Sequence, residues 1–122
     1  MSEFKTLFAA YGGDYATTMG RFMGNEGLYL RLLPKLFDDD SLPKLGAALE
    51  AGDLDTAFEA AHTLKGVAGN LGLDPLYTAV SDLVEPLRKR QAADYSALYQ
   101  VVQTQFRRVE ELQEQIERGQ QG

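Results

Sequence analysis

Apolar residues recur three and four positions apart along almost the whole chain, and short glycine, aspartate and proline signals interrupt them. This spacing gathers apolar side chains on one face of an α-helix, whereas a half-buried strand needs strict alternation. The sequence contains no such alternating stretch, no internal repeat and no low-complexity segment. A chain of 122 residues is long enough to bury one hydrophobic core. We therefore expect an all-α protein with a single domain over residues 1–122.

The N-terminal part is expected to form short helices. One is predicted over about residues 3–10, and a second, capped by Asp14, should run to about Phe22. An apolar stripe then starts at Glu26 and contains Pro34. Proline lacks the N–H that an internal helix position donates, so it predicts a kink or an early break in this stripe.

Four longer helices follow, and each is expected to begin at a polar N-cap residue: Ser41, Asp53, Asp74 and Asp94. Gly52 and Gly72 are expected to end the first two, because glycine readily adopts the left-handed conformation found there. Pro86 should bend the third helix near its end. Short connections favour antiparallel neighbours. The predicted fold is an antiparallel four-helix bundle over about residues 25–118, with one or two short N-terminal helices over about residues 3–22.

The helix expected over Leu54 to Leu71 carries the only histidine of the chain, His62. At about 3.6 residues per turn, its small and aliphatic side chains share one broad face. The predicted core face consists of Ala57, Ala60, Ala61, Leu64, Val67, Ala68 and Leu71. His62 falls nearly opposite the centre of this face, so its imidazole should project into solvent.

The neighbours of His62 suit attack on a phosphoryl group. A neutral imidazole nitrogen can attack phosphorus, and Lys65 at position i+3 would screen the charge that arrives. Gly66 and Gly69 each cost about 1 kcal/mol relative to alanine inside a helix. We interpret them as leaving room for a partner, with close helix packing as the alternative. Phe58, at position i−4, is expected to belong to the docking face, together with part of a neighbouring helix that the sequence does not identify.

These residues resemble the signature of histidine-containing phosphotransfer (HPt) domains: His62-Thr63-Leu64-Lys65-Gly66, followed by Ala68, Gly69, Asn70, Leu71 and Gly72. The resemblance extends over about residues 13–118. It implies that His62 accepts a phosphoryl group from the phospho-aspartate of one receiver domain and passes it to another, with Lys65 as the nearby cation. The implied partners are response-regulator receivers and hybrid histidine kinases. Mg²⁺ would belong to the receiver, and we expect no cofactor on this chain.

Composition argues against several other functions. The net charge of −6 disfavours nucleic acid as a partner. We interpret the basic run Arg88-Lys89-Arg90 as the solvated end of a helix. With no cysteine and one histidine, a typical zinc site is not expected, and Asp38-Asp39-Asp40 lacks the spacing of a calcium loop. The sequence contains neither a membrane-spanning stretch nor a signal peptide, so we expect a complete cytoplasmic domain. The resemblance to HPt domains implies that a chain of this size is a monomer.

One alternative from another class stays open. A helical interaction module could bind a receiver or another signalling protein without accepting phosphate. An autonomous enzyme is not expected, because the sequence offers neither a nucleotide-binding motif nor an acid–base pair for His62. Phosphorylation of His62 distinguishes a phosphoryl carrier from an interaction module.

Overall fold

The computed structural model of the chain describes residues 3–121, and all regular secondary structure in this range is helical. The elements are α1 (Glu3–Tyr11), α2 (Tyr15–Arg21), α3 (Glu26–Leu32), the 3₁₀ helix η1 (Leu33–Asp38), α4 (Ser41–Ala51), α5 (Leu54–Asn70), α6 (Asp74–Arg88) and α7 (Tyr95–Gln121). The all-α prediction is therefore confirmed.

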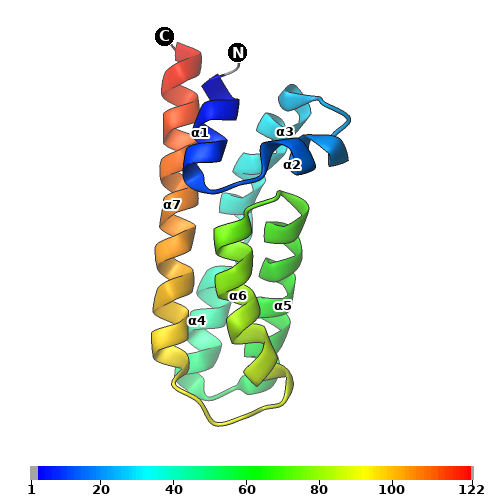
Figure 1. Ribbon diagram of the computed structural model, residues 1–122. Coiled ribbons are helices and arrows are strands. Elements are labelled where there is room, and N and C mark those ends of the chain that lie inside the picture. Colours follow the sequence, from blue (N-terminus) through cyan, green and yellow to red (C-terminus); the bar gives the residue numbers. More distant parts are fainter. Residues whose placement is uncertain (1–2, 122) are drawn as a thin grey trace.

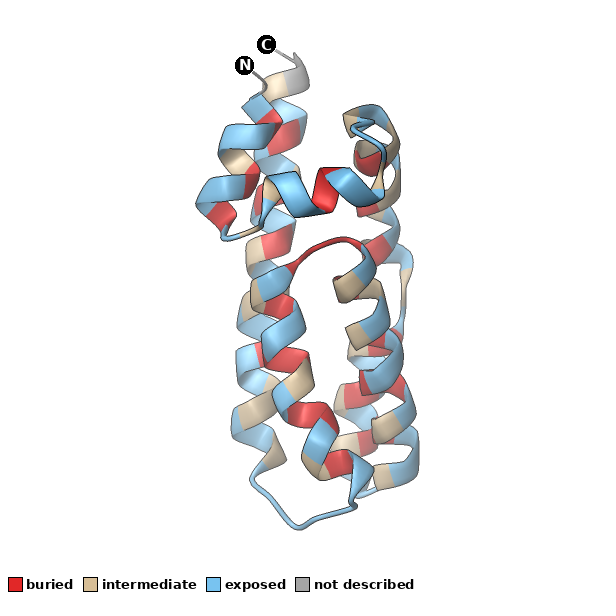
Figure 2. Cartoon of the chain, turned by 45° about the vertical axis from the view of Figure 1, so that its right-hand side comes forward, coloured by how far each residue is buried: buried red, intermediate tan, exposed pale blue. Residues whose placement is uncertain are grey.

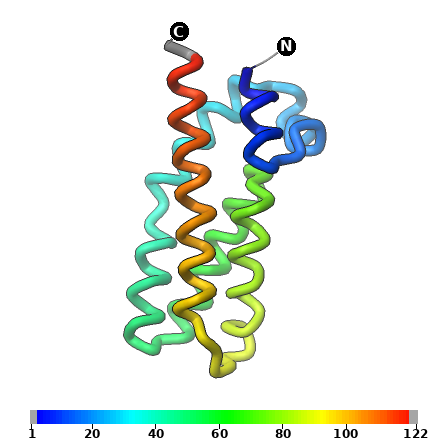
Figure 3. The backbone as a smooth tube through the Cα atoms, turned by 60° about the vertical axis from the view of Figure 1, so that its left-hand side comes forward, coloured from blue at the N-terminus to red at the C-terminus, as the bar shows by residue number. Residues whose placement is uncertain are grey.

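The four longest helices, α4 to α7, lie side by side (Figure 1). Each contacts the next along the chain, and α7 also contacts α4. Figure 3 shows α7 passing between α4 and α6 and continuing beyond them, where α1 packs against it. The short helices α2 and α3 lie near the C-terminal end of α5 (Figure 1). The helix that carries His62 is thus flanked by α4 on one side and α6 on the other.

Three of the predicted N-caps and both predicted glycine stops lie where the sequence pattern placed them. Asp14, Asp53 and Asp94 each accept a hydrogen bond from the backbone N–H three residues later. Gly52 ends α4 with a φ of 72°, and Gly72 follows the end of α5 with a φ of 66°. Both glycines occupy the left-handed region that residues with a Cβ rarely adopt. The start and end of α5 are therefore determined by residues close in sequence: Asp53 through its carboxylate, and Gly72 through its left-handed backbone.

Two predicted N-caps are wrong by one residue. Ser41 is the buried first residue of α4, and its N–H donates to the carboxylate of Asp39 at 2.7 Å, while Asp40 occupies the cap position. Asp74 is likewise the first residue of α6 rather than its cap. Here Pro75, in the first turn, has no N–H for a cap to satisfy, so a side-chain cap is less needed.

The two prolines in predicted helices behave differently. Pro34 lies in the first turn of η1, directly after α3 ends at Leu32, so the predicted early break is confirmed. By contrast, α6 continues through Pro86 to Arg88. Pro86 lies in the last turn, where little helix follows it.

Buried residues, red in Figure 2, recur along the helices and in the connection between α5 and α6, and they form one hydrophobic core. The predicted core face of α5 is buried, except that Val67 is only half-buried and packs against the core. Tyr29 on α3 is fully buried, and its hydroxyl donates to the carbonyl of Leu71 at 2.6 Å. This hydrogen bond fixes α3 to the C-terminal end of α5.

Candidate functional site

His62 is exposed near the middle of α5, on the side opposite the buried alanines. The ring of Phe58 lies against its imidazole, with 5.7 Å between the ring centroids and 21° between the planes. This is an offset parallel stack, a favourable arrangement for two aromatic rings. Phe58 itself is half-buried. One side of the imidazole is therefore covered by Phe58, and the residue as a whole stays accessible.

Lys65 lies one turn beyond His62 and leans toward α6. Its ammonium is 5.7 Å from the ring centroid of Tyr77, a distance typical of a cation–π contact. In the described part of the chain, no carboxylate lies within ion-pair distance of Lys65. Its positive charge is therefore available to an anion that approaches His62.

The two glycines on this side of α5 have different surroundings. A Cβ added to Gly66 would meet no atom within 4 Å beyond the helix backbone, so the surface there is open. A Cβ added to Gly69 would lie 3.1 Å from the ring of Tyr77. The carbonyl of Gly69 also accepts a hydrogen bond of 2.6 Å from Arg21. At Gly69 the bare backbone makes room for the Tyr77 ring, which fits the packing alternative, whereas the open surface at Gly66 fits the clearance interpretation; use of either glycine by a partner stays a prediction.

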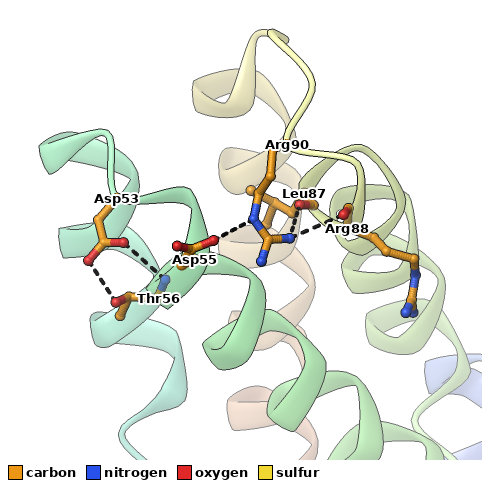
Figure 4. A network of polar contacts seen from close by, with 6 residues as sticks. All are labelled: Asp53, Asp55, Thr56, Leu87, Arg88 and Arg90. Atoms are coloured by element: carbon orange, nitrogen blue, oxygen red, sulfur yellow. Dashed lines mark hydrogen bonds and ion pairs between the residues drawn. The ribbon is translucent and has the colours of Figure 1, made fainter.

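Arg88 and Arg90 come close to the site although the sequence pattern did not predict it. Their guanidinium carbons lie 5.2 and 5.0 Å from the ring centroid of Phe58. Arg90 also donates from Nε to Asp55 on α5 at 2.7 Å (Figure 4). Interpreting this basic run as a solvated helix end was therefore incomplete. The contacts join residues far apart in sequence, and no local motif signals them.

The two flanks of α5 differ in character. The flank toward α6 carries cations and aromatic rings: Phe58, Lys65, Tyr77, Arg88 and Arg90. Between α4 and α5 runs a groove of about 660 Å³. Small residues line much of this groove, and its carboxylates come from Asp39, Asp40, Asp53 and Glu59. They outnumber its cation, Lys44, which pairs with Asp40 at 3.2 Å. An anionic group that approaches His62 is therefore better accommodated on the α6 side.

The Asp53 carboxylate caps the N-terminus of α5. Hydrogen bonds from the Thr56 hydroxyl and backbone N–H hold the pKa of the Asp53 carboxyl below its ordinary value of 3.8. An ionised carboxylate at this end also interacts favourably with the helix dipole. The ionised Asp53 cap therefore stabilises the helix that carries His62.

Comparison with known proteins gives one match. The family model of the Hpt domain matches residues 38–121, which include α4 to α7 and His62. No curated protein and no solved structure matches the chain. Among the described helices, none combines the length and apolar character needed to cross a membrane. Because the match covers more than half of the sequence, the chain belongs to the Hpt domain family and is a signalling module of the phosphotransfer type.

Proposed function

We propose that His62 is the phosphoryl carrier of a multistep two-component phosphorelay. It accepts a phosphoryl group from the phospho-aspartate of one receiver domain and passes it to the aspartate of another. The observation that carries this proposal is the position of the chain's only histidine. It is exposed on the helix that the Hpt family match includes, next to the open backbone at Gly66.

The transfer step requires only one ring nitrogen of His62 as a nucleophile. Its lone pair forms the P–N bond while the P–O bond to the donor aspartate breaks, and that electron pair leaves on the carboxylate. The other ring nitrogen keeps its proton during attack. The reverse bond changes, with an aspartate carboxylate of a second receiver as the nucleophile, return the imidazole to its starting state.

The surroundings of His62 support this step without an enzyme-like set of groups. Lys65 offers a cation one turn away, which attracts the phosphoryl oxygens. Gly66 lets the partner's backbone approach α5 closely. Phe58 covers one side of the ring. We propose a carrier without an ATP site or cofactor of its own, to which the receiver brings Mg²⁺.

The proposal extends to partners and setting. Hpt domains generally interact with receiver domains, so response-regulator receivers and hybrid histidine kinases are the proposed partners. We further propose that α4 to α7 form the antiparallel four-helix bundle of this domain, and that the protein acts as a cytoplasmic monomer.

The experiment that tests this function is a two-step relay with purified proteins. A phosphorylated receiver from a panel is mixed with the chain, and a second receiver is added once label has moved. We expect an acid-labile, alkali-stable label on the wild type and its later appearance on the second receiver. His62→Gln should fold and bind receivers yet carry no label. If every receiver that binds the wild type leaves it unlabelled, the non-phosphorylated interaction module replaces the carrier.

A further inference from the structure

We propose that Arg90 and Phe58 are positioning residues that hold the His62 imidazole in one orientation for phosphoryl transfer, with Asp55 aiming Arg90. This inference rests on the proposed function and deepens it. Its basis is a continuous chain of contacts that runs from Asp55 through Arg90 and Phe58 to His62.

Arg90 is held at several points around its guanidinium. Nε donates to Asp55 Oδ1 at 2.7 Å, and one terminal nitrogen donates to the carbonyls of Leu87 at 2.6 Å and Arg88 at 3.2 Å (Figure 4). A planar guanidinium fixed in this way has a defined orientation. Its carbon lies 5.0 Å from the Phe58 centroid, within cation–π range. Arg90 therefore joins the end of α6 to the first turns of α5.

The backbone at Arg90 indicates that its side chain matters. Its φ is 52°, in the left-handed region where glycine is favoured after a helix. Among the described residues, only Met23 shares a positive φ without being glycine. A glycine at position 90 would suit the backbone better than arginine does. The contacts of the guanidinium offset this preference, and they lead directly to the ring that stacks on His62.

Phe58 connects the fixed guanidinium of Arg90 to the imidazole of His62. A histidine on an exposed helix face can occupy several side-chain rotamers, and only some direct a ring nitrogen toward an incoming phosphorus. Stacking on Phe58 selects among them. Phe58 in turn is covered by Arg90 and Arg88. Restricting the nucleophile before the partner arrives raises the fraction of encounters that react.

A purely structural role for Arg90 predicts a different result. Its hydrogen bonds to the carbonyls at the end of α6 could serve only to end that helix. In that case, removing the side chain would change stability, and the orientation of His62 and the rate of transfer would stay unchanged. A docking role also predicts a distinct result, namely a higher KM for the receiver with an unchanged kcat.

The first measurement uses the imidazole itself. Because the chain contains one histidine, its ring C–H resonances are unambiguous in an NMR spectrum. Arg90→Gly removes the guanidinium and keeps a backbone that tolerates the left-handed φ. Met23→Gly makes the same backbone change at a residue with φ 55° and 86% exposure, in the connection between α2 and α3. We expect Arg90→Gly and Phe58→Leu to shift the His62 resonances in the same direction, and Met23→Gly to leave them in place.

The second measurement is receiver-to-His62 transfer at saturating and limiting receiver. We expect Arg90→Gly to lower kcat about three- to tenfold, the factor that corresponds to losing one aromatic or cation–π contact, with KM unchanged. Arg90→Lys keeps the charge without the planar fork, so it should restore little of the rate. Unchanged imidazole resonances, or a change confined to KM, would overturn the positioning role.

The NMR measurement needs no phosphoryl donor, which separates this inference from the proposed function. If the wild type accepts no label but its imidazole responds to Arg90→Gly, the carrier function fails and Arg90 still orients the ring. If the wild type is labelled and Arg90→Gly changes neither the resonances nor kcat, the positioning inference fails and the carrier function stands.

Discussion

Replacing Gly66 by alanine should make the protein more stable and a poorer phosphoryl acceptor. Gly66 lies inside α5, and an added Cβ would meet no atom within 4 Å beyond the helix backbone. Alanine is favoured over glycine inside a helix by about 0.8–1 kcal/mol. With no clash to subtract, the free energy of unfolding should rise by nearly this amount. For a domain of this size, the corresponding increase in Tm is about 3–6 °C.

The same methyl group should impede transfer, because it stands on the His62 side of α5 where a partner must approach. A small displacement of the reacting atoms is enough to lower the rate strongly, and we expect kcat/KM to fall about ten- to a hundredfold. Stability is measured by urea and thermal unfolding followed by circular dichroism, and transfer by the rate of labelling from one phosphorylated receiver. Gly20→Ala is the control, because Gly20 lies in α2 and is equally open. It should not slow transfer.

Two results would show that Gly66 is not kept for the approach of a partner. A less stable Gly66→Ala variant would mean that the glycine serves packing or backbone geometry within the fold. A more stable variant that is labelled at the wild-type rate would mean that transfer does not need bare backbone at this position. The predicted combination, more stability with less transfer, is expected where a residue is kept for access and not for folding.

Three further predictions concern the fold around α5. Tyr29→Phe removes the buried hydroxyl that donates to Leu71, so the free energy of unfolding should fall by about 1–2 kcal/mol in urea titrations; an unchanged midpoint would contradict this. Gly72→Ala should lower it by about 2 kcal/mol or more in thermal scans, since φ is 66° and the Cβ would lie 2.1 Å from a threonine hydroxyl on α2; wild-type stability would refute the clash. The lowered pKa of Asp53 contributes stability that is present above its ordinary value of 3.8 and lost as pH falls through the lowered value. Asp53→Asn keeps a helix cap, so its acid unfolding curve should lose this component, and an identical curve would contradict the assignment.

The parts of the fold that the sequence predicts best depend on contacts within one helical turn. The caps at Asp14 and Asp53 need only a carboxylate and the N–H three residues later, and both are present. Pro34 breaks its helix because the missing N–H is a property of the residue itself. The predicted cap of α4 is wrong by one residue because Asp39, Asp40 and Ser41 all offer a capping oxygen. The sequence pattern alone does not distinguish these three residues.

The parts that the sequence could not predict depend on contacts between helices. His62 was placed on the exposed side of α5 from helical periodicity, and it lies there. Periodicity does not say which residue of α6 meets Gly69, and there Tyr77 takes up the space. Nor does it show that Arg90 turns back over Phe58, because this requires the left-handed backbone at the end of α6. The groups that cover Phe58 and Lys65 beside His62 therefore come from α6 and the residues that follow it.

Covalent phosphorylation of His62 can be detected by NMR, because the chain contains a single imidazole. Phosphorylated receiver is added to the chain, and the imidazole and phosphorus spectra are recorded together. If His62 carries phosphate, we expect a new set of His62 ring resonances and an acid-labile phosphoramidate phosphorus signal, both absent from His62→Gln. Ring resonances that shift gradually on receiver binding, with no phosphorus bound to nitrogen, would contradict the account and leave a module that binds receivers without carrying phosphate.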